Sequence, residues 1–197
     1  MSIEIKPNHV TFFRMGAVPV IALLICMKSL VPSLLALVLF TLAALSDWLD
    51  GYLARKYHDG SLLGQVFDNV ADKMLVISCL LALAVSNRLN GGLVLPALAI
   101  VLREIFITGL REYASRKAEA GGEQPADPTP LASSQLAKAK TVTQMVAIGF
   151  LISVPALMPL FVGMIGSFLL WVAAGLALYT GYQYWMEARF TPVKAEG

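Results

Sequence analysis

The sequence has little of what a water-soluble domain needs. Only 14% of its 197 residues are charged, whereas 57% are hydrophobic and the mean hydropathy is +0.71. Soluble domains carry about a quarter charged residues, which makes a water-soluble globule a poor fit. Because a membrane-spanning helix takes about 20 residues, the apolar content provides about five or six spans. We therefore expect one membrane-embedded domain over residues 1–197, with no separate soluble domain.

Cysteines and dense basic runs are also scarce. The two cysteines, Cys26 and Cys79, lie within apolar stretches, so neither a disulfide framework nor a thiol metal site is indicated. The net charge of +2 comes without a dense run of basic residues along the sequence, so no nucleic-acid partner is expected. No cleavable signal pattern precedes the first apolar stretch, and we expect a mature N-terminus.

Apolar segments alternate with polar breaks and predict an all-α protein with six transmembrane helices. The segments run over residues 11–27, 33–45, 62–85, 93–113, 136–154 and 160–185, with the second continuing into a charged stretch that ends near Tyr57. Residues 118–130 form the only real loop. Thirteen of the fifteen Lys and Arg fall on the side of the two termini, and only Lys28 and Arg88 fall opposite. This asymmetry predicts that both termini are cytoplasmic.

Four aspartates, Asp47, Asp50, Asp68 and Asp72, lie at the ends of the second and third segments. An ionisable group there costs several kcal/mol unless it is paired or faces a wet cavity, so it indicates function. Spacings of three and four place each pair on one helix face. If the two segments are antiparallel neighbours, the four carboxylates converge in a polar cavity open to the cytoplasmic side.

Four crowded carboxylates repel one another, so either some are protonated or a divalent cation neutralises them. The donor set is oxygen only, which favours Mg²⁺ or Mn²⁺ over zinc. Two such cations would suit phosphoryl transfer. The alternative is that the acids cap helices or pair with Arg55 and Lys73.

Residues beside the aspartates favour a phosphate-containing ligand. Gly51 and Gly64 lie inside helical patterns, where glycine costs about 0.5–1 kcal/mol relative to alanine, and they leave clearance for a bulky head group. Arg55 offers a fork of donors to a phosphate, and Ser61 adds a hydroxyl in the turn that follows. Close helix packing is the alternative reason for either glycine.

The spacing from Asp47 to Asp72 is D-x2-D-G-x2-A-R-x8-G-x3-D-x3-D. It resembles the signature of the CDP-alcohol phosphotransferase family at every defined position, and the resemblance extends over the whole length. It implies an enzyme of phospholipid synthesis in the bacterial cytoplasmic membrane that cleaves a CDP-linked lipid, releases CMP and attaches the lipid phosphate to an alcohol. It also implies a homodimer.

The same resemblance implies roles for individual residues. Asp47, Asp50, Asp68 and Asp72 are the expected ligands of two divalent cations, and Asp72 is the expected general base on the acceptor hydroxyl. The expected CDP-lipid-binding residues are Gly51, Arg55, Ser61 and Gly64.

Four basic residues bear on the acceptor: Arg103, Arg111, Lys138 and Lys140. Arg103 and Arg111 share roughly one helix face, and with the two lysines they predict a cationic cluster at the cytoplasmic surface. Such a cluster suits an acceptor that already carries phosphate. The alternative is a basic flank that holds anionic lipid head groups.

Five further residues have supporting roles in this prediction: Asn8, Thr11, Arg14, Thr108 and Gln144. Together with the basic cluster they resemble the branch of the family that uses CDP-diacylglycerol as donor and sn-glycerol 3-phosphate as acceptor. Ala137 departs from that branch, which commonly has glycine there. The rival acceptors are phosphatidylglycerol, serine and an inositol phosphate.

A function of another class, divalent-cation transport, remains as a remote alternative. Transport sites lie near the bilayer midplane, whereas these acids lie towards one surface with Arg55 among them. A purely structural scaffold leaves the four acids unexplained.

Overall fold

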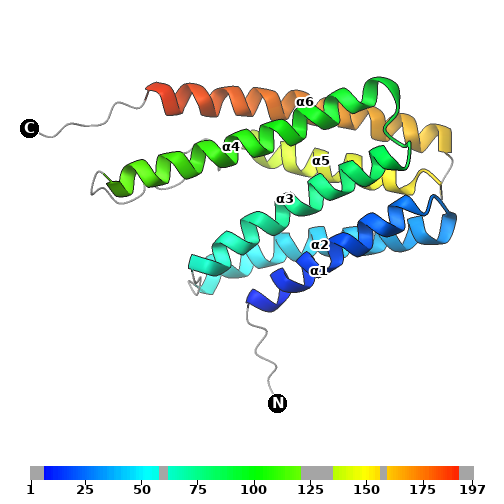
Figure 1. Cartoon of the computed structure of the whole chain (residues 1–197), viewed down its shortest axis with the longest axis horizontal. Helices are drawn as coiled ribbons and strands as arrows, with labels where there is room; N and C mark the ends of the chain where they lie inside the picture. The colour runs from blue at the N-terminus through cyan, green and yellow to red at the C-terminus, as the bar shows by residue number, and fades with distance from the viewer. Residues whose placement is uncertain (1–6, 58–61, 121–134, 156–158, 191–197) are drawn as a thin grey trace, which may run out of the picture. The chain divides into compact units, whose positions relative to one another are not determined.

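The structure is a computed structural model that describes residues 7–57, 62–120, 135–155 and 159–190. Side chains are described for residues 14–46, 70–71, 73–113, 135–155 and 160–186. The described ranges contain helices and no strand (Figure 1). The elements are α1 (Pro7–Cys26), α2 (Leu30–Tyr57), α3 (Leu62–Val85), the short 3₁₀ helix η1 (Gly91–Leu93), α4 (Val94–Ala120), α5 (Gln135–Ser153) and α6 (Pro159–Phe190).

The six predicted helical segments are therefore confirmed as helices, with small differences at their ends. Helix α2 begins at Leu30 rather than at residue 33. Pro32 is tolerated in its first turn, because a backbone N–H at that position would have no partner within the helix. Helix α4 continues to Ala120, three residues into the stretch that the sequence assigns to a loop.

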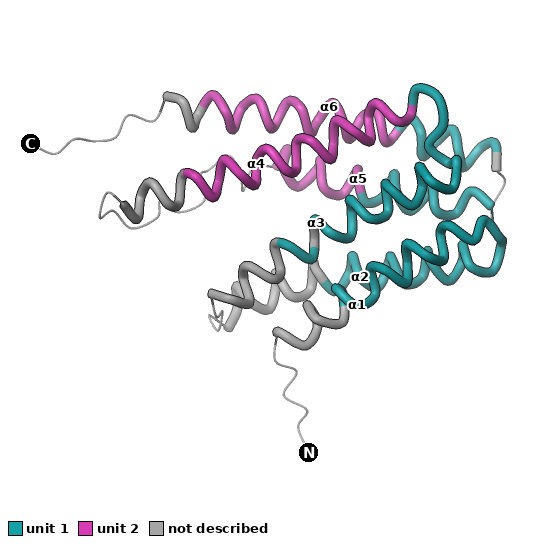
Figure 2. Tube along the Cα trace, viewed as in Figure 1, with its two compact units in different colours: residues 1–92, 145–168 teal, residues 93–144, 169–197 magenta. Residues whose placement is uncertain are grey.

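The helices form two compact units (Figure 2). Unit 1 comprises residues 1–92 and 145–168, and unit 2 comprises residues 93–144 and 169–197. Helices α1, α2 and α3 belong to unit 1 and α4 belongs to unit 2, whereas α5 and α6 each contribute residues to both units.

In unit 1, α1 packs against both α2 and α3. The core is aliphatic, with Ile21, Ile25, Leu75 and Leu83 fully buried. Helices α5 and α6 approach closely at Gly166, where a Cβ atom would lie 3.1 Å from Cγ of Leu151. Small and aliphatic side chains thus bring these helices together, and the core also encloses a few polar side chains, such as Arg14 and Ser33.

The polar breaks of the sequence end α1 and α3. Lys28 and Asn87 follow these helices with φ values of 54° and 59°, the left-handed conformation of a helix C-cap. After α3, the Asn87 amide donates to the Ala84 carbonyl at 3.0 Å and the Arg88 amide donates to the Leu83 carbonyl at 2.9 Å. These two bonds form a Schellman motif, which satisfies carbonyls that the helix leaves without partners.

Arg88 joins three helices of unit 1. Its guanidinium donates to the carbonyls of Ile25 at 3.1 Å and Ile152 at 2.8 Å, and to Oγ of Ser33 at 2.9 Å. Burial lowers the pKa of the Arg88 guanidinium below its ordinary value, but an arginine stays protonated in proteins. The positive charge therefore lies against the carbonyl ends of α1 and α5, where the helix dipole favours a cation.

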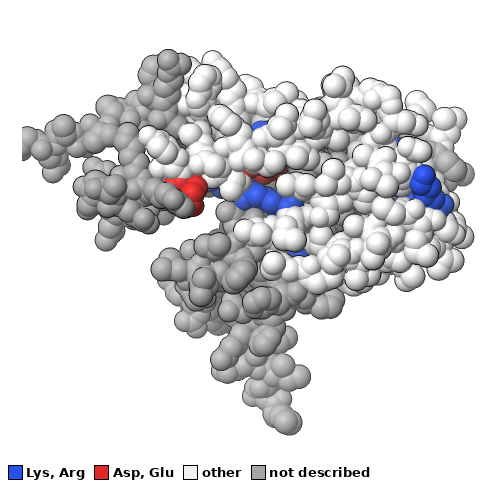
Figure 3. Space-filling model, viewed as in Figure 1, with Lys and Arg blue, Asp and Glu red and all other residues white. Residues whose placement is uncertain are grey.

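The outer surface of the described part is largely apolar. Large hydrophobic side chains such as Leu23, Val85, Leu160 and Phe168 are more than two-thirds exposed, and few charged groups are visible on the described face in Figure 3. Two helical stretches, Gly91–Tyr113 and Leu160–Met186, are long and apolar enough to cross a membrane. Shorter apolar stretches are Arg14–Cys26, Leu30–Ser46 and Lys73–Val85. The helix count matches the sequence prediction, while six spans stay a prediction.

Replacing Arg88 by methionine is expected to destabilise unit 1, because two carbonyls and one hydroxyl lose a charged donor. Hydrogen bonds to charged groups contribute about 1.5–3 kcal/mol, so we expect a loss of about 3 kcal/mol. Thermal unfolding in detergent micelles measures it. Lys28→Met is the matched control, since Lys28 is an exposed cation that follows the same α1 terminus. Equal melting temperatures for the two variants would contradict the anchoring role of Arg88.

Candidate active site

The aspartate signature lies on the two helices that meet at one end of unit 1. Helix α2 continues through Asp47 and Asp50, and α3 begins before Asp68 and Asp72. The two helices run in opposite directions (Figure 1). Five Cα–Cα steps separate Tyr57 from Leu62, which limits the distance between the helix ends to about 19 Å.

This backbone arrangement agrees with the antiparallel pair that the sequence prediction requires. The pairs Asp47/Asp50 and Asp68/Asp72 are spaced by three and four residues within continuous helix, so the members of each pair occupy neighbouring positions on one helix face. The structure describes only the backbone at the four aspartates, Gly51, Arg55 and Gly64. Ser61 lies outside the described residues altogether. The proposed metal and CDP-lipid contacts therefore remain predictions.

Unit 2 holds a buried charged cluster formed by Arg103, Glu104 and Lys140. Oε1 of Glu104 accepts from Nζ of Lys140 at 2.5 Å and from a guanidinium nitrogen of Arg103 at 3.3 Å. The three side chains are about nine-tenths buried. One carboxylate is thus shared by two cations, which leaves an excess of positive charge among these three side chains.

Arg103 also binds α6. Its Nε donates to the carbonyl of Ala177 at 3.2 Å and a terminal nitrogen donates to Oγ1 of Thr180 at 3.2 Å. A Cβ atom at position 181 would lie 3.2 Å from Cγ of Arg103, so Gly181 allows the arginine stem to pass close to α6. Much of the donor capacity of Arg103 is therefore used within unit 2.

The two other basic residues of the expected cluster lie differently. The guanidinium of Arg111 lies over the ring of Tyr184, 5.3 Å from its centroid, a cation–π geometry. Arg111 and Lys138 are both exposed. The structure thus brings Arg103 and Lys140 together through Glu104, and leaves Arg111 and Lys138 at the surface.

The supporting residues that the structure describes are mostly buried. Arg14 on α1 is 1% exposed, and Gln144 on α5 is 3% exposed. The hydroxyl of Thr108 donates to the Glu104 carbonyl at 2.6 Å, so this hydroxyl serves the helix itself. The side chains of Asn8 and Thr11 lie outside the described residues.

Glu104 is the site residue that the sequence reasoning missed. An acid within an apolar segment is a functional signal, and the same rule selected the four aspartates. Glu104 stands in such a segment directly beside Arg103. The rule therefore identifies Glu104 once it is applied to the fourth helix as well.

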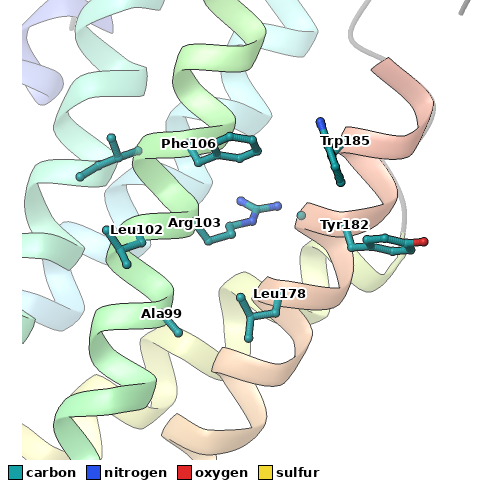
Figure 4. A pocket seen from close by; sticks show the side chains of 9 residues that line it. Ala99, Leu102, Arg103, Phe106, Leu178, Tyr182 and Trp185 are labelled. Carbon is teal, nitrogen blue, oxygen red and sulfur yellow. The ribbon is translucent and has the colours of Figure 1, made fainter. Parts of the chain in front are cut away.

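An open apolar groove lies between α4 and α6 in unit 2 (Figure 4). Its volume is about 740 Å³. Phe106 and Trp185 lie at one end, Ala99 and Leu178 lie at the other, and the Arg103 guanidinium points towards α6 between them. Because its lining is almost wholly hydrocarbon, the groove suits an apolar chain better than a charged group.

Glu104→Gln is expected to destabilise unit 2 more than Lys140→Met. The first change leaves two buried cations without their shared anion, and breaking a buried pair in this way costs about 3–5 kcal/mol. The second leaves Glu104 its contact with Arg103, and we expect a loss of about 2 kcal/mol. Melting temperatures of the two single variants and of the double variant measure the order and the coupling. The opposite order, or additive losses, would contradict the shared carboxylate.

Comparison with known proteins gives consistent matches along the chain. The family model described as CDP-alcohol phosphatidyltransferase matches residues 4–179. Three relatives are each named CDP-diacylglycerol–glycerol-3-phosphate 3-phosphatidyltransferase. The protein of Rickettsia bellii is 33% identical over 94% of this chain and 96% of its own length. That of Pseudomonas fluorescens is 35% identical over 97% and 93%, and that of Shigella flexneri is 34% identical over 93% and 94%.

Proposed function

The chain belongs to the CDP-alcohol phosphatidyltransferase family, and from this we propose that it transfers the phosphatidyl group of CDP-diacylglycerol to sn-glycerol 3-phosphate. The products are phosphatidylglycerophosphate and CMP. The observation that carries the assignment is the near full-length match to relatives named for this reaction. The complete Asp47–Asp72 signature in the chain supports it.

The four aspartates suit divalent cations, because their donor atoms are all carboxylate oxygens. Asp47 and Asp50 on α2 and Asp68 and Asp72 on α3 would hold two Mg²⁺ or Mn²⁺ ions. When bound, such ions neutralise phosphate charge and stabilise the attacking and leaving oxygens. The helical backbone at all four positions supports this assignment, since it keeps the spacing on which the ligand pairs depend.

The transfer needs a nucleophile and a leaving group at one phosphorus. A hydroxyl oxygen of the acceptor forms the new bond to the phosphatidyl phosphorus, and the bond between that phosphorus and the oxygen of CMP breaks. Asp72 takes the hydroxyl proton as general base. Gly51 and Gly64 leave room for the nucleotide head group, while Arg55 and Ser61 donate to its pyrophosphate.

The acceptor phosphate requires cations near the cytoplasmic ends of α4 and α5. Lys140 keeps further ammonium hydrogens beyond its bond to Glu104, and Arg111 and Lys138 are exposed. We assign phosphate binding chiefly to these three residues. Arg103 belongs to the same cluster, but its bonds to α6 and Glu104 give it the additional role of holding that cluster in place.

The proposed setting is the bacterial cytoplasmic membrane, with both termini in the cytoplasm and the active protein a homodimer. Two long apolar helices and the exposed hydrocarbon side chains support the membrane setting. The distribution of Lys and Arg supports the orientation. The apolar α4–α6 groove is compatible with a lipid substrate.

Purified protein is expected to release CMP only with CDP-diacylglycerol, glycerol 3-phosphate and Mg²⁺ or Mn²⁺ together. Chelation should abolish release, and Asp68→Asn or Asp72→Asn should lower the rate by about 1,000-fold or more. Each change removes a proposed metal ligand, and Asp72→Asn also removes the base. Asp59→Asn is the matched control, because Asp59 lies in the same stretch but at an undefined position of the signature. Full activity after chelation would overturn the metal assignment. A panel of serine, phosphatidylglycerol and inositol phosphate tests the acceptor.

Arg111→Met and Lys138→Met are expected to raise the KM for glycerol 3-phosphate by about 10-fold, which is the effect of one lost charge-assisted contact. The KM for CDP-diacylglycerol should change little, because these residues lie on α4 and α5 and not on the signature helices. Steady-state kinetics with each substrate varied in turn measures both constants. Parallel rises in the two constants would count against an acceptor site here.

A further inference from the structure

Gln144 presents an unusual polar group beside the charged cluster of unit 2. Its side chain is 3% exposed, and its Oε1 atom has no hydrogen-bond partner among the described residues. A buried amide without a partner is costly, so native structures nearly always satisfy one. Each exception calls for an explanation, and one such explanation is a ligand that supplies the missing partner.

The position of Gln144 relates it to the phosphate-binding residues. Gln144 follows Lys140 by four residues on α5, so the two side chains are neighbours on one helix face. Lys140 is 7% exposed and is held by Glu104 of α4. An ammonium group and an amide whose oxygen has no partner among the described residues therefore lie side by side on the buried face of α5.

The Lys140 ammonium and the Gln144 amide suit different ligand groups. A phosphate dianion offers only acceptor oxygens, so it binds Lys140 and is repelled by the amide oxygen of Gln144. A hydroxyl both donates and accepts. It therefore satisfies the amide whichever way the Gln144 side chain is turned.

We propose that Gln144 is the specificity-determining residue for the acceptor and binds the secondary hydroxyl of glycerol 3-phosphate, the hydroxyl that does not react. This inference rests on the proposed function and adds the recognition of the non-phosphate end of the acceptor. A site that hydrogen-bonds a substrate hydroxyl rejects the analogue that lacks it, because a buried polar group is then left without a partner.

The test compares two acceptors in the wild type and in Gln144→Met, a variant of similar length with no hydrogen-bonding amide. The acceptors are glycerol 3-phosphate and 3-hydroxypropyl phosphate, which keeps the phosphate and the primary hydroxyl but lacks the secondary one. The wild type is expected to prefer glycerol 3-phosphate by about 10-fold or more in kcat/KM. In Gln144→Met we expect glycerol 3-phosphate to lose about 10-fold while 3-hydroxypropyl phosphate is unchanged, so that the preference disappears.

Two further measurements separate this role from a structural one. Gln135→Met is the matched control, because it makes the same change at an exposed position of α5, and it should keep the wild-type preference. The melting temperature of Gln144→Met should equal or exceed that of the wild type, since the change removes a buried amide oxygen that has no partner among the described residues. A structural glutamine would instead lower the melting temperature on removal.

Several outcomes would overturn the inference. They are equal losses with both acceptors in Gln144→Met, no loss with either, a lowered melting temperature, or a wild type that does not distinguish the two acceptors. Absence of CMP release by the wild type with glycerol 3-phosphate would overturn the proposed function and this inference with it. Equal losses in the variant would overturn this inference alone.

Discussion

Buried charge in an apolar protein is the constraint on which this structure depends. The outer helix faces carry hydrocarbon side chains, so a charged group inside must find its partners within the protein. Arg88 does so with carbonyls at helix ends, and Glu104 does so by sharing one carboxylate between two cations. Each solution joins helices that are far apart in the sequence.

Some of these polar groups stabilise the fold, and others are available to bind a ligand. The guanidinium of Arg88 donates to three protein atoms of unit 1, which identifies it as an anchor. Lys140 is positioned by Glu104 yet keeps donors for a ligand. Gln144 differs from both residues, because its buried amide oxygen has no hydrogen-bond partner among the described residues.

The proposed chemistry assigns different halves of the reaction to different helices. Carboxylates on α2 and α3 provide the oxygen donors that divalent cations prefer, and cations on α4 and α5 provide the counter-charge for a phosphate-bearing acceptor. The groove of α4 and α6 has an almost wholly hydrocarbon lining apart from Arg103, and it suits an apolar chain. A nucleotide-linked lipid and a polar acceptor require these separate environments.

The sequence alone determined the helices and the reaction class. Lys28 and Asn87 end helices where polar breaks interrupt the apolar segments, and the Asp47–Asp72 spacing identified the family before any fold was known. Both signals are local, since they depend on residues within one or two adjacent helices.

Only the tertiary structure decided which polar side chains meet. Arg103 binds residues 74 and 77 positions away on α6, Lys140 binds Glu104 across 36 positions, and Arg88 reaches Ile152 across 64. Periodicity shows which face of a helix a residue occupies, but it does not show which other helix packs against that face. That is why the sequence grouped four basic residues together, whereas the fold joined two of them through an acid and left two at the surface.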